Sequence, residues 1–309
     1  GRDADGAARV KGDPRMADVL ARAVANRQRV PARPVPLQVE QHTVTLRPRD
    51  VLGAREAARR SRKPHNEARV VFVREILTRL ARQLGDAPSI GSGAESRADL
   101  FATLRESRDV RREVNWCWGP ITPHRLLRNL FADHAERSGA ADGLLSPQEQ
   151  AALARERTAE WTVDDVPLLD EAAELLGDEP PASPDAERAR LERREQLDQA
   201  RRALETSGAG GMLTASALVD RYAGDDALDS LADRAAAERS WAYGHIVIDE
   251  AQELSPMMWR LLMRRCPTRS MTVVGDVAQT GSPSGISDWG SALAPYVEDR
   301  WRLARLDIN

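Results

Sequence analysis

Cysteine and long apolar runs are scarce in this sequence, and each scarcity excludes a class of protein. The two cysteines of the 309 residues, Cys117 and Cys266, lie far apart and have no metal-ligand neighbours, which excludes a disulfide framework and a zinc site. No run approaches the roughly 18 apolar residues of a membrane span. The N-terminus has no apolar signal-peptide core. The sequence therefore predicts a cytoplasmic protein that does not span a membrane.

The charge of the chain is nearly balanced. It has 45 basic and 48 acidic side chains, a net charge of −3, and 41% hydrophobic residues, which is a globular composition. Only Lys11 and Lys63 are lysines, so almost all positive charge is arginine; with the abundant alanine, this indicates a GC-rich genome. A protein that coats duplex DNA should be strongly basic, so any contact with nucleic acid must be local.

Apolar residues at helical spacing predict a mostly helical chain before residue 178. Residues 1–36 hold a candidate helix at 17–27 and then three prolines, and they are predicted to be a linker and lead-in. Residues 39–46 alternate and predict a short strand or ribbon. Helices are predicted at residues 48–60, 66–84, 96–104, 108–116 and 122–134, and from capping sequences that begin at Ser146 and Thr162.

Residues 178–240 are strongly charged and predict a helical insertion that is partly flexible. Its acidic stretches, 178–198 and 220–233, are as consistent with a solvated loop as with competition with nucleic acid or binding of Mg²⁺.

The last 70 residues have a different pattern, with short apolar runs that predict strands. Apolar runs at 245–248 and 271–274 enclose a predicted helix at 255–265, and 301–308 predicts a third strand. Short apolar runs separated by a helix are typical of a parallel sheet in an α/β fold.

Polar residues follow each of the two apolar runs. Asp249 and Glu250 come at the end of the first, and Gly275 and Asp276, with Gln279 just beyond, come at the end of the second. The edge where parallel strands end is where open α/β sheets bind ligands. One carboxylate there can hold Mg²⁺, and the next can orient or deprotonate water. Acidic residues also end strands for solubility, but the two loops together are a stronger indication of a site.

The two loops also resemble a known family. Asp249-Glu-Ala-Gln252 followed by Gly275-Asp-Val-Ala-Gln279 resembles motifs II and III of superfamily 1 helicases of the UvrD/Rep type. Residues 166–177, 249–259 and 274–281 look like the actinobacterial HelD (HelR) branch, whose members are ATP-driven factors that bind RNA polymerase, strip nucleic acid from it and recycle it. The resemblance covers about residues 160–309.

The resemblance implies the fold and its division. The chain would be an α/β fragment: part of the parallel sheet of a RecA-like P-loop NTPase domain with a large, mostly helical inserted domain. Residues 37–160 would form the inserted domain, and residues 161–177 and 241–309 the RecA-like core. Because the chain begins without Met and stops after a strand-like run, it is expected to be a piece of a longer protein.

The resemblance also implies site residues, cofactors and partners. Asp249 and Glu250 would hold Mg²⁺, with Glu250 and Gln279 catalytic and Glu250 the base that positions water. ATP would be bound by Gln252, Gly275, Asp276 and Gln279. The two glutamines would also couple the nucleotide state to the surface that faces nucleic acid or polymerase. The expected partners are the RNA polymerase core and, weakly or indirectly, DNA.

Two parts of the family's nucleotide site are missing from this sequence. No G-x-x-x-x-G-K-[ST] loop occurs, so the backbone and lysine cradle for phosphates is absent. The chain also stops at Asn309, before the arginine that would reach the γ-phosphate. An arginine finger contributes roughly 10³–10⁵ in rate, so this chain should not hydrolyse ATP by itself.

Two other interpretations and two further features stay open. The chain could belong to a UvrD/Rep-type helicase that moves on single-stranded DNA, or it could be a non-catalytic module that binds RNA polymerase. The basic residues of 55–63 could contact nucleic acid or form a solvated helix end. Trp116 and Trp118 could stack on a base or pack in a core.

Overall fold

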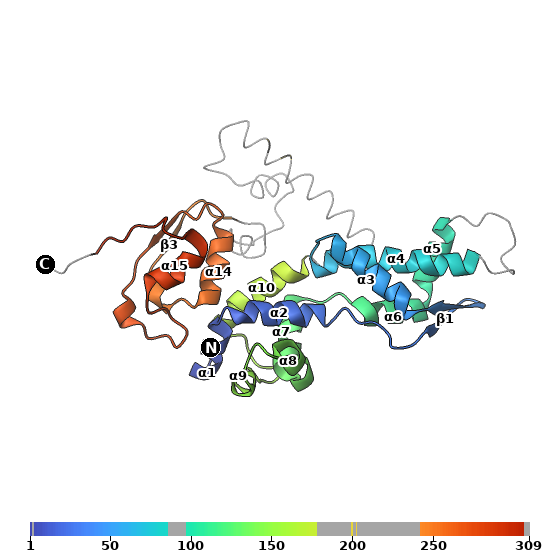
Figure 1. The fold of residues 1–309 in the computed structure, drawn as a ribbon, viewed down its shortest axis with the longest axis horizontal. Coiled ribbons are helices and arrows are strands. Elements are labelled where there is room, and N and C mark those ends of the chain that lie inside the picture. Colours follow the sequence, from blue (N-terminus) through green and yellow to red (C-terminus); the bar gives the residue numbers. More distant parts are fainter. Residues whose placement is uncertain (2, 86–96, 178–198, 200–201, 203–241, 306–309) are drawn as a thin grey trace, which may run out of the picture. The chain divides into compact units, whose positions relative to one another are not determined.

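The computed structural model describes residues 1, 3–85, 97–177, 199, 202 and 242–305 (Figure 1). The chain divides into two compact units, residues 1–179 with 243–309, and residues 180–242. The predicted charged insertion at 178–240 and its acidic stretches lie outside the described residues, apart from single positions. The fold described below is that of the first unit.

The first unit is an α/β fold that is mostly helical. Its helices are α1 (Asp5–Gly12), α2 (Arg15–Ala25), α3 (Pro48–Arg60), α4 (His65–Gly85), α5 (Arg97–Glu106), α6 (Arg108–Trp118), α7 (Pro123–Ala132), α8 (His134–Ala141), α9 (Pro147–Ala152), α10 (Val166–Leu176), α14 (Pro256–Arg265) and α15 (Trp289–Val297). Its strands are β1 (Val35–Val39), β2 (His42–Leu46), β3 (Ile246–Ile248) and β4 (Met271–Val273). The helices predicted before residue 178 and at 255–265 are present. The one predicted at 122–134 is divided because the Asp133 carboxylate accepts the N–H groups of Ala135 and Glu136 and so begins α8.

The prediction that residues 1–36 form a linker is wrong for α1 and α2. One face of α2 is buried against α7 and α10 in a first core, through Met16, Val19, Leu20, Ala23 and Val24. These residues have the three- and four-residue spacing of an amphipathic helix. The prolines that follow the helix do not contradict it, because a proline after a helix only prevents its continuation.

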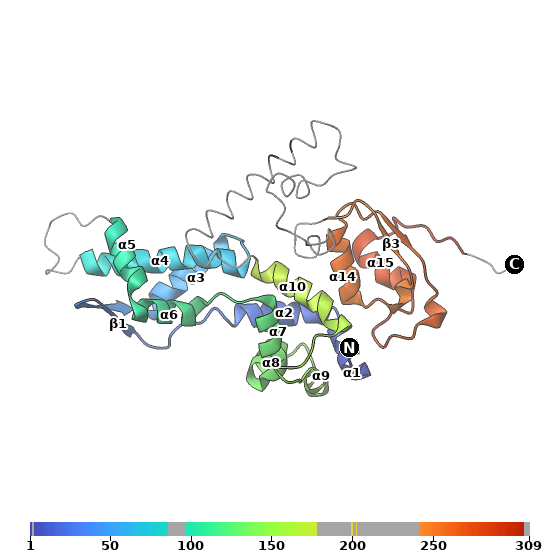
Figure 2. The ribbon, with the colours of Figure 1, turned by 180° about the vertical axis from the view of Figure 1, so that it is seen from behind.

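The ribbon predicted at 39–46 is an antiparallel hairpin of β1 and β2, and Pro36 lies inside β1. Thr45, the residue opposite Pro36, bonds to the side chain of Gln83 rather than to β1. Its N–H donates to Gln83 Oε1 and its carbonyl accepts from Gln83 Nε2, both at 2.9 Å. A proline fits here because this position needs no ladder donor. The hairpin packs with α3, α4 and α6 into a second core that contains Phe72, Cys117 and Trp118 (Figure 2).

The predicted parallel pair is confirmed. β3 and β4 lie parallel with Ile248 opposite Val273, and α14 connects them. Trp259 of α14 is fully buried in a third core with residues of β3 and α15. The third strand predicted at 301–308 is wrong for 301–305, which are exposed and irregular, and the rest lies outside the described residues. The sheets described are thus two pairs of strands.

α10, from the stretch 161–177 that was predicted to belong with the later part of the chain, contacts both the first core and α14. The apolar face of α10, with Leu168, Ala172 and Leu176, packs on α2 and α7 in the first core. Met257 of α14 belongs to the same core, and Asp170 and Glu171 form ion pairs with arginines of α14. α10 therefore contacts both the early helices and α14.

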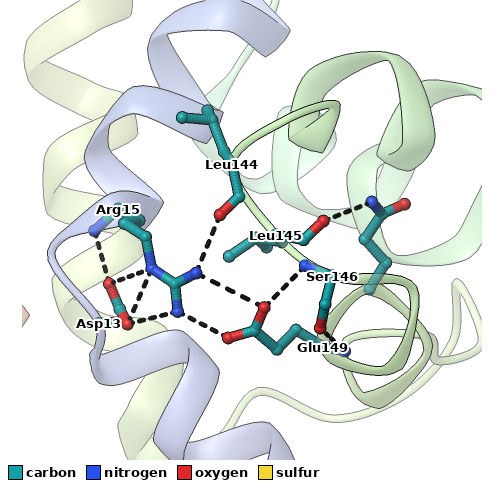
Figure 3. A network of polar contacts seen from close by, with 7 residues as sticks. Asp13, Arg15, Leu144, Leu145, Ser146 and Glu149 are labelled. Carbon is teal, nitrogen blue, oxygen red and sulfur yellow. Dashed lines mark hydrogen bonds and ion pairs between the residues drawn. The ribbon is translucent and has the colours of Figure 1, made fainter.

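The capping box predicted at Ser146 is present and is part of a wider polar network (Figure 3). Arg15 contacts Glu149 Oε1 at 2.6 Å and Asp13 Oδ2 at 2.7 Å, and donates to the Leu144 carbonyl at 2.9 Å. Glu149 also accepts from the Ser146 N–H at 2.7 Å. The network therefore ties the start of α2 to the start of α9.

We expect Glu149→Gln to destabilise the chain at neutral pH but not in strong acid. The hydrogen bond from Arg15, followed by those from Ser146, lowers the pKa of Glu149 from 4.5 to about 2. Because its pKa is lower in the folded chain, the ionised Glu149 stabilises the fold above pH 4.5, the pKa of this group in the unfolded chain. This contribution is lost as the pH falls toward 2. The variant should melt about 2 °C below the parent at pH 7 and converge with it in acid. The control Glu156→Gln, at an exposed position, should leave the melting temperature unchanged at both pH values. If Glu149→Gln lowered the melting temperature equally at pH 7 and in acid, the role assigned to Glu149 would be contradicted.

Candidate functional site

The two loops predicted to form a site lie at one edge of the β3–β4 pair. Because the strands are parallel, both chains leave the sheet at the same edge. The Val274 N–H donates to the Ile248 carbonyl at 2.8 Å, and the Ala251 N–H donates to the Val274 carbonyl at 3.0 Å. The loop after β3 and the loop after β4 are therefore bonded to each other immediately beyond the strands.

Four of the predicted site residues form one chain of hydrogen bonds across these loops. Gln252 donates through Nε2 to Glu250 Oε2 at 2.6 Å and accepts at Oε1 from the Asp276 N–H at 3.0 Å. Gln279 donates through Nε2 to Asp276 Oδ2 at 2.8 Å. Gln252 is only 2% exposed, whereas Glu250, Asp276 and Gln279 are exposed. The buried amide of Gln252 thus links the Glu250 carboxylate to the backbone of Asp276, whose own carboxylate accepts from Gln279.

Gly275 makes this arrangement possible. A Cβ atom on Gly275 would overlap Gln252 Oε1 and lie 3.0 Å from the Ala251 nitrogen. Only a residue without a side chain lets the two loops approach so closely. Glycine here is therefore a packing requirement of the Gln252 bridge.

We expect Gly275→Ala to lower the free energy of unfolding by about 1–3 kcal/mol, because the new methyl group displaces Gln252. Urea unfolding measures this change. Gly281→Ala is the matched control in the same loop, since a Cβ there meets nothing nearer than 3.7 Å. Equal stability of the two variants would show that the loops are not held as described.

Glu250 has a backbone conformation that is unusual for its residue type. Its φ is +49°, in the left-handed region, and it turns the chain from β3 into the short helix Ala251–Glu253. The Asp249 carboxylate accepts the Glu250 N–H at 2.9 Å and supports this turn. The left-handed region costs a residue with a side chain about 1–2 kcal/mol. In this conformation the Glu250 carboxylate accepts the hydrogen bond from Gln252.

The donor set suits Mg²⁺ bound together with phosphates. Asp249 and Glu250 are adjacent, exposed carboxylates, and Mg²⁺ in nucleotide sites is held through one or two carboxylates, water and substrate phosphates. The part of the chain that the structure describes has no group of three or more His, Cys, Asp or Glu residues that could hold a metal by themselves. Asp249 and Glu250 could therefore hold Mg²⁺ only together with water or the oxygens of a bound substrate.

The sequence did not predict a cluster of ion pairs between α14 and α10. Glu171 Oε2 lies 2.7 Å from Arg260 Nε and 2.6 Å from Arg264 Nη2, and Asp170 Oδ1 lies 2.6 Å from Arg265 Nη2. Burial acts to raise the pKa of Glu171, but the two arginines outweigh it, so the pKa is lowered. In the sequence, this cluster could have been suspected from the two adjacent acidic residues, which have apolar residues on both sides. The cluster fixes α14, which begins four residues after Gln252, to the first core.

No family model matches this chain, and no curated protein matches it. Among the described helices, none is both long enough and apolar enough to cross a membrane. The function proposed below therefore depends on the geometry of the two loops and on their sequence pattern.

Proposed function

We propose that this chain is part of an ATP-driven, helicase-like motor of the HelD type, which binds bacterial RNA polymerase in the cytoplasm and releases it from nucleic acid. The observation that carries the proposal is the hydrogen-bonded chain from Glu250 through Gln252 and Asp276 to Gln279, at the edge where two parallel strands end. β3 and β4 would be two strands of a RecA-like sheet.

Each residue has a separate role in this proposal. Asp249 and Glu250 would hold Mg²⁺, which neutralises charge on the phosphates. Glu250 would also orient the attacking water and accept its proton, and Gln279 would contact the terminal phosphate. Gln252 is buried between the loops, so a movement of Glu250 would shift Asp276, whose N–H Gln252 accepts.

The helix α14 is the proposed route from this site to the rest of the unit. It begins at Pro256, directly after the loop that contains Gln252, and its last turn is paired with Asp170 of α10. α10 in turn packs on α2 and α7. A change at the nucleotide edge would therefore displace α10 through ion pairs and alter the grip of the helical part on the polymerase.

Capture of core RNA polymerase tests the proposal and separates it from the two alternatives. A protein that contains this chain should retain core polymerase at high salt. A conventional helicase should instead bind single strands in a salt-sensitive manner and leave polymerase in the flow-through. Polymerase binding that persists without any nucleotide-dependent change would favour the non-catalytic module. Failure to bind polymerase at any salt concentration would overturn the proposal.

A further inference from the structure

Gln28 and Arg29 connect the C-terminal end of α3 to the end of α6, where a tryptophan is exposed. Arg55 donates to the Gln28 carbonyl at 3.3 Å, and Arg59 donates to Gln28 Oε1 at 2.7 Å. The next residue, Arg29, lies over the ring of Trp116 at 5.7 Å. We call this surface the basic patch; it consists of Arg29, Arg55, Arg59, Arg60, Arg62, Lys63, Arg69 and Trp116.

Residues 28 and 29 join the two helices that form the basic patch. The Arg29 N–H donates to the Cys117 carbonyl at 2.8 Å, which fixes this segment against the end of α6. From α4, Arg69 donates to Asn115 Oδ1 at 2.7 Å, next to the tryptophan. The side chains of Arg55, Arg59 and Arg69 are therefore held by contacts within the protein.

Among the described residues, the basic patch has a single ion pair with a carboxylate. Glu136 lies 3.7 Å from Arg29, but the other basic residues of the patch form no ion pair with a carboxylate among the described residues. Burial, followed by the neighbouring charge of Arg55, lowers the pKa of Arg59. Phosphates would relieve this repulsion, because each one brings a negative charge to the surface.

Trp116 is the second feature that points to a ligand. It is 43% exposed, whereas Trp118, two residues later, is 1% exposed and lies in the second core. A large exposed aromatic ring next to arginines is the arrangement on which unpaired bases stack, while the backbone follows the positive charge. Bases inside a duplex do not offer a free face to such a ring.

We propose that the basic patch binds single-stranded nucleic acid, with phosphates on the arginines and Lys63 and a base stacked on Trp116. The proposal does not depend on the nucleotide edge at residues 249–279, because no residue of that edge belongs to the patch. It gives the helical part of the chain a nucleic-acid contact of its own.

Fluorescence anisotropy with labelled oligo(dT), oligo(U) and a DNA duplex tests the proposal on the 309-residue chain. The variant Arg59→Gln/Arg60→Gln/Lys63→Gln removes three exposed charges. If each of the three contacts a phosphate, the slope of log K against log salt should become shallower by about 2. Between 1 M and 0.1 M salt, the variant should therefore gain about 100-fold less affinity than the parent. Trp116→Ala should weaken binding by about 5- to 150-fold, and Trp116→Phe should retain most of it.

Matched controls decide the outcome. Arg302→Gln/Arg305→Gln removes two exposed arginines outside the patch and should leave binding close to that of the parent. Unchanged melting temperatures show that the variants fold. The proposal is overturned if the parent does not bind either single strand at 50 mM salt, if duplex binds as tightly as single strands, or if Trp116→Ala has no effect. Loss of polymerase capture by the triple variant, without any oligonucleotide binding, would assign the patch to an acidic protein surface instead.

Discussion

Glu250→Gln should reduce ATP hydrolysis by about 10²–10⁴-fold, the usual contribution of a general base. The measurement requires a protein in which this chain is joined to a phosphate-binding loop and an arginine finger. The substitution removes the charge and the ability to accept a proton. It keeps the fold, because the side-chain amide oxygen can still accept the hydrogen bond that Gln252 donates. Binding of Mg²⁺-ATP should therefore persist while turnover is lost.

Glu253→Gln is the matched control for this experiment. Glu253 lies in the same loop, but its carboxylate accepts the Gly281 N–H at 2.6 Å, a bond that an amide oxygen can replace. Hydrolysis by this variant should stay close to that of the parent. Equal rates for Glu250→Gln and the parent would remove Glu250 from the mechanism, and equal losses in both variants would point to a general disturbance of the loop.

Lys11→Met should lower the free energy of unfolding by about 3–5 kcal/mol, the cost of breaking a buried ion pair on one side. Lys11 is 1% exposed, and its Nζ lies 2.5 Å from Asp3 Oδ2 and 2.8 Å from Asp165 Oδ1. Asp165 is fully buried; its other oxygen contacts Arg155 at 2.8 Å. Removal of the ammonium group leaves a buried carboxylate oxygen without its cation, and Arg155 compensates only in part.

The effect of Lys11→Met should also depend on pH. Burial acts to raise the pKa of Asp165, but the hydrogen bond from Lys11 and those from Thr162 and Arg155 outweigh it, so the pKa lies below 3.8. The ionised Asp165 stabilises the fold fully when the pH is above the pKa of this group in the unfolded chain. This stabilisation is lost as the pH falls through its pKa in the folded chain. Urea unfolding should therefore show a difference between parent and variant that narrows below about pH 3.8. Lys63→Met, at an exposed lysine, should change stability by less than about 0.5 kcal/mol.

Local patterns were sufficient to predict α3, α4 and the parallel pair. The apolar spacing along 66–84 predicted α4, and Gly85 marked its last residue. The apolar runs before Asp249 and Gly275 predicted strands, and their separation by one helix predicted that they are parallel. The same parallel arrangement explains why the two loops were predicted to be adjacent.

Other features depend on tertiary contacts that no local pattern encodes. The linker prediction for residues 1–36 gave the prolines more weight than the amphipathic face of α2, whose partner α10 is more than 140 residues away in the sequence. The buried position of Gln252 follows from the close approach of Gly275, which requires both loops in place. The basic patch likewise depends on Gln28 and Arg29, which join α3 to α6 only in the folded chain.

Release of labelled nucleic acid from core RNA polymerase tests the central claim most directly. A protein that contains this chain, with a complete nucleotide site, should release the nucleic acid repeatedly in the presence of ATP. With a non-hydrolysable ATP analogue, or with Glu250→Gln, it should bind polymerase without repeated release. Release that is equally efficient without ATP hydrolysis would contradict the motor assignment.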